Sequence, residues 1–149
     1  MGKIIGFLGH KGAGKDTAGE YLIERYKYKR YAFADPVKEI ARNMFDLSED
    51  QLHGNKKEEI DARWNLRPRT IFQRLGTELG QYDIHKLFPE MKGKVKTRRF
   101  WTYLFEQWLE KNKNENIVIT DVRFKHEIEV IKKYGEQIIK ISNPNVKNH

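Results

Sequence analysis

Apolar residues gather along the chain in two kinds of stretch. Some form short continuous runs, which are typical of strands buried on both faces of a parallel sheet. Others recur every three or four positions, which is typical of one face of a helix. The two kinds alternate, and strands that alternate with helices predict a parallel sheet with right-handed connections. The expected strands are residues 3–8, 31–34, 116–120 and 137–141.

The expected helices are marked by their spacing and by the residues at their starts. In residues 37–45 apolar side chains recur at i, i+3, i+4, i+7 and i+8, and Asp35 with Pro36 ahead of them predicts an N-cap and a first-turn proline. Thr70, with Gln73 three residues later, predicts a capping box at the start of a second helix. The other expected helices are one from Ala18, one whose face holds Trp101, Leu104, Phe105 and Trp108, and one over residues 127–135 with Gly135 as its C-cap.

Two charged stretches interrupt this alternation. Residues 46–68 show no strand pattern and are expected to form a mobile arm, with a short helix from Ser48 as one option. Residues 85–99 are rich in lysine and are expected to form a basic loop. The chain has 149 residues, enough for one domain with a real core. The expected fold class is therefore α/β, a single domain built as a three-layer sandwich of about four parallel strands with helices on both faces.

The composition narrows the classes of partner. A net charge of +8 favours anionic partners, namely nucleotides, nucleic acid or an anionic membrane surface. No stretch approaches the ~20 apolar residues of a membrane span, and no membrane partner is expected. The chain has no cysteine, which excludes disulfides and cysteine-bound metals and fits a reducing compartment such as the cytoplasm. The five histidines are scattered without ligand spacing, so no histidine metal site is expected.

The connection after the first strand, GHKGAGKDT, carries the clearest chemistry. Gly9 to Lys15 fit the first seven positions of the phosphate-loop pattern G-x-x-x-x-G-K-[ST], whereas Asp16 stands at the eighth and Thr17 follows it. Glycines let successive backbone N–H groups point at phosphate oxygens, and the helix that follows adds its dipole. The alternative is a tight glycine turn with a surface lysine. The position between a strand and a helix favours phosphate binding.

Further candidates follow the third strand or lie on the expected helices. Ligands of parallel sheets bind beyond the carboxyl ends of the strands. Asp121 ends the third strand, where it would suit Mg²⁺ or, alternatively, cap a helix. Arg123, two residues on, would clamp a phosphoryl group. Gly76 inside a helix suggests a close approach to the backbone, and Trp101 would either stack on a base or pack in the core.

Several motifs together resemble the phage-type deoxynucleoside monophosphate kinase family, within the phosphate-loop (P-loop, Walker A) nucleoside monophosphate kinases. They occur in the family's order and cover nearly the whole chain. The combination of the loop with Q-x-x-G-T-E and T-D-x-R-x-x-x-E is specific, whereas the loop alone is not. The motifs are GKDT at residues 14–17, FADPVK at 33–38, RTIFQRLGTE at 69–78, RFWTYLFEQWLE at 99–110 and VITDVRFKHEIEVIKKYG at 118–135.

The resemblance implies an enzyme that transfers the γ-phosphoryl group of ATP to a deoxynucleoside monophosphate, with Mg²⁺. Lys15, Asp121 and Arg123 would be catalytic. The ATP phosphates would be held by Gly9, Lys11, Gly12, Ala13, Gly14, Lys15, Asp16 and Thr17. The acceptor nucleotide would be bound by Lys38, Arg69, Gln73, Trp101, Asp121 and Arg123. The candidate metal ligands, partly through water, are Thr17, Asp16 and Asp121.

Some points stay open at this level. The arm is shorter than in some relatives, and the family's C-terminal lid, last strand and last helix are expected to be absent, so adenine is expected to be held weakly. Another small-molecule kinase of this fold and a non-catalytic protein that binds nucleotides or nucleic acid are the alternatives. The expected partners are small molecules, with no specific nucleic acid, and a homodimer is one option for assembly. The accepted base and the sugar preference are not encoded in any motif.

Overall fold

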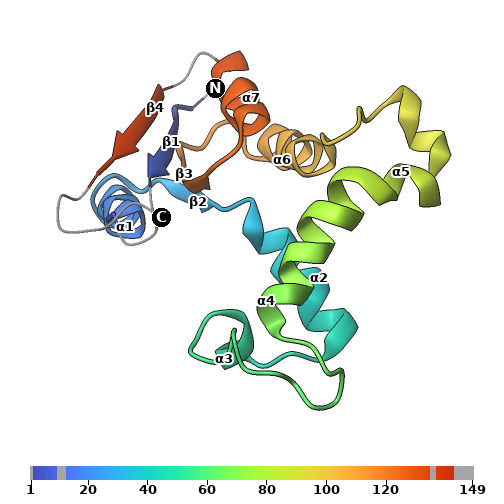
Figure 1. Ribbon diagram of the computed structural model, residues 1–149. Helices are drawn as coiled ribbons and strands as arrows, with labels where there is room; N and C mark the ends of the chain where they lie inside the picture. The colour runs from blue at the N-terminus through green and yellow to red at the C-terminus, as the bar shows by residue number, and fades with distance from the viewer. Residues whose placement is uncertain (1, 10–12, 135–136, 143–149) are drawn as a thin grey trace. The chain divides into compact units, whose positions relative to one another are not determined.

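The computed structural model describes residues 2–9, 13–134 and 137–142. The chain forms two compact units (Figure 1). The first unit combines residues 1–33 with residues 102–149, so it is built from both ends of the chain, and the second consists of residues 34–101. The single kinase domain expected from the sequence stays a prediction. In the part of the chain that is described, no helix combines the length and the apolar character that crossing a membrane requires.

The first unit contains the expected four-stranded parallel sheet. The strands run in the order β2-β3-β1-β4, and every neighbouring pair is parallel. The two central strands are the most apolar, as their position between two layers of helices requires. The α/β fold class predicted from the sequence is confirmed. The strands are β1 (Ile4–Gly9), β2 (Lys29–Tyr31), β3 (Ile117–Val122) and β4 (Gln137–Ile141).

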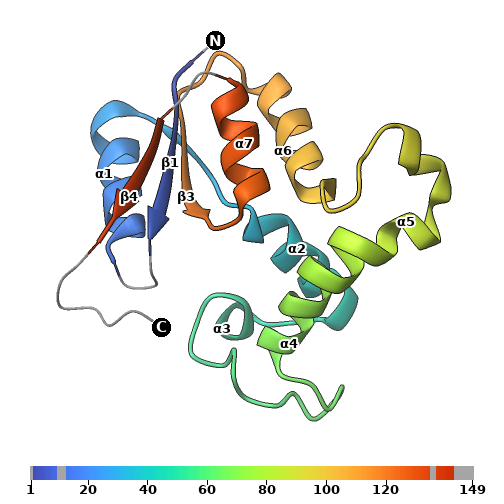
Figure 2. The same cartoon turned by 45° about the horizontal axis from the view of Figure 1, so that its top comes forward.

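Helices cover both faces of this sheet, which gives the three layers of the sandwich. Helix α1 (Lys15–Tyr26) lies on one face, and α6 (Phe100–Lys111) and α7 (Lys125–Lys133) lie on the other (Figures 1 and 2). Phe105 and Ile131 from the second pair belong to one buried cluster with the strands. On the opposite face, a Cβ atom on Gly19 would lie 2.5 Å from the Thr120 side chain, so this glycine lets α1 approach the sheet closely.

Two predicted boundaries around β2 are wrong by a few residues. The strand ends at Tyr31 and does not continue through residue 34. The backbone N–H of Phe33 donates to the Asp121 carboxylate at 2.9 Å, and the chain turns there into α2 (Ala34–Phe45). Because this helix begins at Ala34, Asp35 lies in its first turn and is not the N-cap. The carboxylate contact comes from a residue 88 positions away, which no local pattern reveals.

The second unit is wholly helical outside its turns and one isolated bridge. Helix α4 (Pro68–Gln73), the π-helix η1 (Arg74–Asp83) and helix α5 (Ile84–Leu87) follow one another without a break (Figure 1). The predicted capping box at Thr70 is wrong, because α4 already begins at Pro68 with Arg67 as N-cap. A proline has a suitable φ angle and no N–H to satisfy, so it suits the first helical position.

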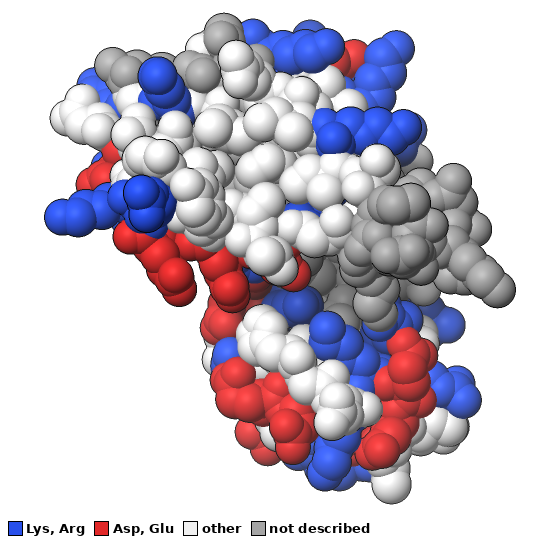
Figure 3. Space-filling view, turned by 90° about the vertical axis from the view of Figure 1, so that its left-hand side faces the viewer, with Lys and Arg blue, Asp and Glu red and all other residues white. Residues whose placement is uncertain are grey.

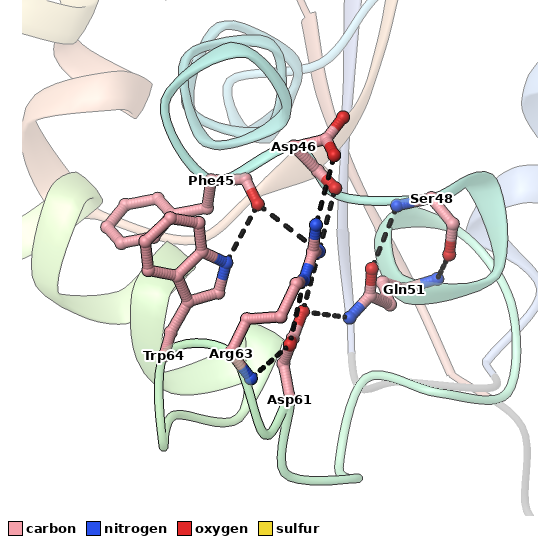
Figure 4. Close-up of polar contacts among 7 residues, drawn as sticks. All are labelled: Phe45, Asp46, Ser48, Gln51, Asp61, Arg63 and Trp64. Carbon is pink, nitrogen blue, oxygen red and sulfur yellow. Dashed lines mark hydrogen bonds and ion pairs between the residues drawn. The ribbon is translucent and has the colours of Figure 1, made fainter.

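The expected arm has a helical turn and a polar cluster. Helix α3 (Glu49–Leu52) begins with a capping box in which Ser48 and Gln51 bond reciprocally, which confirms the short helix predicted from Ser48. Further along, Arg63 donates to the carboxylates of Asp61 and Asp46 at 2.9 and 3.0 Å (Figure 4). It also donates to the carbonyl oxygen of Asp46, just past the end of α2. These contacts join the arm to that helix, and the mobility of the arm stays a prediction.

The expected basic loop is partly helical. Helix α5 continues to Leu87, and a 3-10 helix, η2, follows over Pro89–Gly93. Val95 is buried, and its carbonyl oxygen lies 2.5 Å from Nε2 of the buried His85. The lysines that dominate the segment favour a loop, and they do lie at the surface. The buried residues of this segment, His85 and Val95, are isolated in the sequence and form no periodic pattern, so the sequence does not reveal their burial.

Candidate active site

The end of β1 and the start of α1 form the part of the glycine-rich connection that the structure describes. Gly14 has φ 104°, a left-handed conformation that favours glycine, and it is the N-cap of α1. Its carbonyl oxygen accepts the bond from Ala18 N–H at 2.9 Å, so the helix starts at Lys15. A Cβ atom on Gly9 would lie 2.4 Å from the backbone oxygen of Ile141. A side chain would be strained at position 14 and would clash with the backbone at position 9, so both positions require glycine.

The first turn of α1 carries the charged and hydroxyl groups that follow the loop. Lys15 is half-buried, whereas Asp16 and Thr17 are exposed. The first four N–H groups of a helix have no partner inside it and favour an anion, so this end of α1 suits a phosphate group. Two predicted loop residues, Lys11 and Gly12, lie outside the described residues.

Asp121 lies near the carboxyl end of β3, beside the end of β1. The pairing of Leu8 with Val122 puts the glycine-rich connection and Asp121 at the same edge of the sheet. One carboxylate oxygen of Asp121 accepts the N–H of Phe33 at 2.9 Å, which fixes the orientation of the group. The alternative role as a helix N-cap is excluded, because Phe124 is the N-cap of α7. In the described parts of the chain, no group of three or more His, Cys, Asp or Glu residues is placed to hold a metal ion.

Glu127 supports the turn that carries Arg123. Its carboxylate accepts the backbone N–H groups of Arg123 and Phe124 at 2.8 and 2.9 Å, and the residue is only 5% exposed. Burial raises the pKa of Glu127 to about 7, against the effect of the two N–H bonds. The Arg123 guanidinium lies 5.5 Å from the centre of the Phe124 ring and is exposed. Glu127 is the last residue of the motif T-D-x-R-x-x-x-E, but the sequence predicted no role for it; it lies three residues after the N-cap Phe124, where a capping box places its glutamate.

Three of the predicted acceptor-binding residues lie on helices of the second unit. Lys38 lies on α2 and is half-buried. Arg69 and Gln73 lie on α4, four residues apart, so they share one face of the helix. Both are exposed, and Arg69 pairs with Glu58. The Gln73 side chain makes no hydrogen bond to any other residue that the structure describes.

Trp101, the fourth predicted acceptor-binding residue of this unit, packs on the π-helix. Its Nε1 donates to the carbonyl oxygen of Gly76 at 2.7 Å, and the residue is 8% exposed. A Cβ atom on Gly80 would lie 2.4 Å from the indole nitrogen. This geometry favours the packing alternative for Trp101. The tight approach falls at Gly80, whereas a Cβ on Gly76 would make an ordinary 3.6 Å contact with Val37.

Comparison with known proteins identifies the family. The model of the deoxynucleotide monophosphate kinase family matches in two overlapping segments, residues 3–65 and 46–149. A mimivirus protein named "Putative deoxynucleotide monophosphate kinase", from Acanthamoeba polyphaga mimivirus, is 36% identical over 146 residues, covering 96% of this chain and 75% of the relative. The chain belongs to the deoxynucleotide monophosphate kinase family. The resemblance drawn from the motifs is confirmed.

A second relative agrees with this assignment at a larger distance. The Deoxynucleoside-5'-monophosphate kinase of Escherichia phage T5 is 23% identical over 193 residues, covering 89% of this chain and 72% of the relative. The name of the family describes a kinase that acts on deoxynucleotide monophosphates. Membership therefore makes this chain a kinase-family enzyme, and the residue roles given above remain predictions.

Proposed function

We propose that this chain transfers the γ-phosphoryl group of ATP to a deoxynucleoside monophosphate. An oxygen of the acceptor's phosphate attacks the γ-phosphorus, the bond from that phosphorus to the β–γ bridging oxygen breaks, and ADP leaves with a deoxynucleoside diphosphate as the second product. Family membership supports the reaction class. The observation that carries the proposal is the left-handed Gly14 that caps α1 immediately before Lys15, at the carboxyl edge of the parallel sheet.

Lys15 and the start of α1 bind the ATP phosphates in this proposal. A phosphate brought to a helix N-terminus meets N–H groups without partners and a favourable dipole. Lys15 adds a full positive charge at the same place, and it makes no ion pair with any residue that the structure describes. Phosphoryl transfer needs little covalent help from a protein, so charge and position account for most of the catalysis.

The residues around the loop also suit Mg²⁺. This ion prefers oxygen ligands and is bound through one or two carboxylates, several waters and the substrate's phosphates. Asp121 offers a carboxylate held in a fixed orientation by the Phe33 N–H, and Asp16 and Thr17 offer a carboxylate and a hydroxyl in the first turn of α1. When bound, Mg²⁺ neutralises charge on the phosphates. Arg123, whose backbone is held by Glu127, contributes a planar cation that suits bidentate contact with a phosphoryl group.

Besides Asp121 and Arg123, three acceptor-binding residues of this proposal belong to the second unit. Arg69 and Gln73 present a cation and an amide from one face of α4, which suits a phosphate and the hydrogen-bonding edge of a base. Lys38 on α2 adds a second cation. Trp101 contributes by holding the helix that continues from α4, since its indole is buried against that helix.

A coupled assay of ADP release tests the proposal. The chain is given ATP, Mg²⁺ and one acceptor at a time from a panel of deoxynucleoside monophosphates, ribonucleoside monophosphates and phosphorylated sugars. We expect turnover with at least one deoxynucleoside monophosphate and a diphosphate product of matching mass. ADP release that is independent of any acceptor, or that requires a phosphorylated sugar, would contradict the proposal.

A further inference from the structure

The segment from Tyr82 to Arg99, here called the basic segment, concentrates positive charge. It contains six cations, Lys86, Lys92, Lys94, Lys96, Arg98 and Arg99, and two carboxylates, Asp83 and Glu90. The resulting +4 is half of the net charge of +8, carried by 18 of the 149 residues. The proposed kinase reaction uses none of these side chains.

Half of these six cations form no ion pair with a residue that the structure describes. Lys92, Lys94 and Lys96 are exposed and make no ion pair with a described residue, while Lys86 lies 3.3 Å from Asp83. The arm is different, because there positive and negative side chains lie side by side (lower part of Figure 3). A surface of unpaired lysines attracts a polyanion, whereas a surface of paired charges does not.

Exposed aromatic rings lie at the start of the same segment. Tyr82 is 43% exposed and Phe88 is 54% exposed. The Arg98 guanidinium lies 5.6 Å from the centre of the Tyr82 ring, which brings the two ends of the segment together. Rings combined with cations are the elements from which proteins bind single-stranded nucleic acid, since bases stack on the rings and phosphates contact the cations.

Buried contacts hold the segment in one shape. His85 Nε2 lies 2.5 Å from the Val95 carbonyl oxygen, and both residues are buried. Arg98 has φ 69°, an unusual conformation for a residue with a side chain. Its N–H donates to the carbonyl oxygen of Gln81 at 2.9 Å, which supports that conformation. A surface fixed in this way needs little ordering when it binds a partner.

We infer that the basic segment binds single-stranded nucleic acid without sequence preference, an activity beyond the proposed kinase reaction. The aromatic rings favour this ligand over a simple polyanion. The short helices disfavour a membrane surface, because α5 and η2 have only four and five residues, whereas helices that lie on membranes have extended apolar faces. Contacts to backbone phosphates and base stacking carry no sequence information.

Fluorescence anisotropy of a labelled oligothymidylate of fifteen nucleotides tests this inference on the full chain. Binding should weaken roughly 20- to 50-fold between 50 and 200 mM salt if three to four phosphates are contacted. The triple substitution K92Q/K94Q/K96Q should weaken binding at low salt at least tenfold. The matched control K125Q/K132Q/K133Q removes the same charge from α7 and should change it less than about twofold. Tyr82→Ala should weaken binding roughly fivefold or more, and Tyr82→Phe should not.

Other outcomes would overturn the inference. Equal losses in the two triple variants would mean that only total charge matters. An unchanged affinity in Tyr82→Ala, with equal competition by inorganic polyphosphate, would indicate a general polyanion surface. Displacement of the oligonucleotide by ATP, with no effect of K92Q/K94Q/K96Q, would place binding at the phosphate loop. Binding to vesicles with anionic lipids, but not to the oligonucleotide, would identify a membrane surface. Circular dichroism confirms that each variant is folded.

Discussion

Trp101 and Gly76 are joined by a hydrogen bond of 2.7 Å from the indole Nε1 to the backbone carbonyl oxygen. The ring of the same tryptophan covers Gly80, one turn further along the π-helix. A π-helix is rarely longer than a single turn and is frequent at functional sites, yet η1 has ten residues. Trp101 therefore contacts, at two points, the unusual helix that continues from α4 and its Arg69 and Gln73.

Gly80→Ala should destabilise the chain far more than Gly76→Ala. The new Cβ at position 80 would lie 2.4–2.5 Å from three atoms of the Trp101 ring, so the ring or the helix has to move. At position 76 the new Cβ makes an ordinary 3.6 Å contact. We expect a loss of about 2 kcal/mol in the free energy of unfolding for Gly80→Ala, and no loss or a gain of up to about 1 kcal/mol for Gly76→Ala. Urea unfolding of the two variants measures the difference, and equal effects would argue against the packing role of Trp101.

Lys15→Ala should remove nearly all kinase activity and leave the fold intact. Lys15 lies at the first position of α1 and supports no described ion pair, so its removal should change the free energy of unfolding by less than about 0.5 kcal/mol. Loss of a charge aimed at the transferring group typically costs about a hundredfold or more in turnover. Lys132→Ala, on an exposed position of α7, is the matched control. Wild-type turnover in Lys15→Ala would remove the proposed phosphate site.

Glu127 should make the chain less stable as the pH rises from about 4.5 to about 7. The folded state raises the pKa of this carboxyl from 4.5 to about 7, mainly through burial, so in this interval it keeps a proton that the unfolded chain releases. The contribution is fully present below pH 4.5 and is lost as the pH passes 7. A shift of this size corresponds to about 3 kcal/mol.

Glu127→Gln is the variant that tests this pH dependence. The amide oxygen can still accept the N–H groups of Arg123 and Phe124, but the side chain no longer titrates. The free energy of unfolding of the variant should therefore change less between pH 5 and pH 8 than that of the wild type. Parallel pH curves for the two proteins would show that another group is responsible.

Arg63→Ala should loosen the arm. Arg63 contacts the carboxylates of Asp61 and Asp46 and the last carbonyl oxygens around the end of α2, and Trp64 donates to the Phe45 carbonyl oxygen beside it (Figure 4). Amide hydrogen exchange in residues 46–66 should become faster in this variant, whereas Arg25→Ala on α1 should leave it unchanged. Rapid exchange of the arm already in the wild type would support the mobility expected from the sequence.

The same cluster should weaken in acid. Hydrogen bonds from Arg63 and Gln51 hold the pKa of Asp61 well below its usual range. A carboxylate with a lowered pKa stabilises the folded state above its ordinary pKa of 3.8, and this contribution is lost as the pH falls below that value. Protection factors in the arm, which are exchange rates corrected for the intrinsic pH dependence of amide exchange, should therefore fall below about pH 3.8 in the wild type. The arm of Asp61→Asn should be less protected at neutral pH, and its protection should respond less to acid.

Local patterns revealed the parts of the fold that depend on neighbouring residues. The four strands, the glycine-rich connection and the short helix from Ser48 all follow from short stretches of sequence. The incorrect predictions concern positions whose structure depends on a residue far away in the sequence. Asp121 accepts the N–H of Phe33 and ends β2 early. Trp101 does approach the Gly76 backbone, as expected, but the position where it leaves no room for a side chain is Gly80. The site residues were predicted from the motifs, whereas the burial of Glu127 required the packed structure.

Two different substitutions of Asp121 should distinguish its structural role from its catalytic role. Its carboxylate accepts the Phe33 N–H at 2.9 Å and is also the proposed ligand of Mg²⁺. Asp121→Asn keeps an oxygen that can accept this bond but removes the charge, whereas Asp121→Ala removes both. We expect the free energy of unfolding to fall by about 1 kcal/mol or less for asparagine and by about 1–3 kcal/mol for alanine, since a part-buried N–H is then left without a partner.

In these two variants, turnover should depend on the loss of the negative charge at position 121 and not on the free energy of unfolding. Both should lose about a hundredfold or more in turnover at saturating ATP and Mg²⁺, because neither offers the metal a carboxylate. Asp121→Glu keeps the charge on a longer side chain, so part of its activity should return at high Mg²⁺. The measurement is the rate of ADP release as a function of Mg²⁺ concentration, with the folded fraction taken from urea unfolding of each variant. Full turnover of the folded fraction of Asp121→Asn would make this residue a purely structural link between β3 and the end of β2.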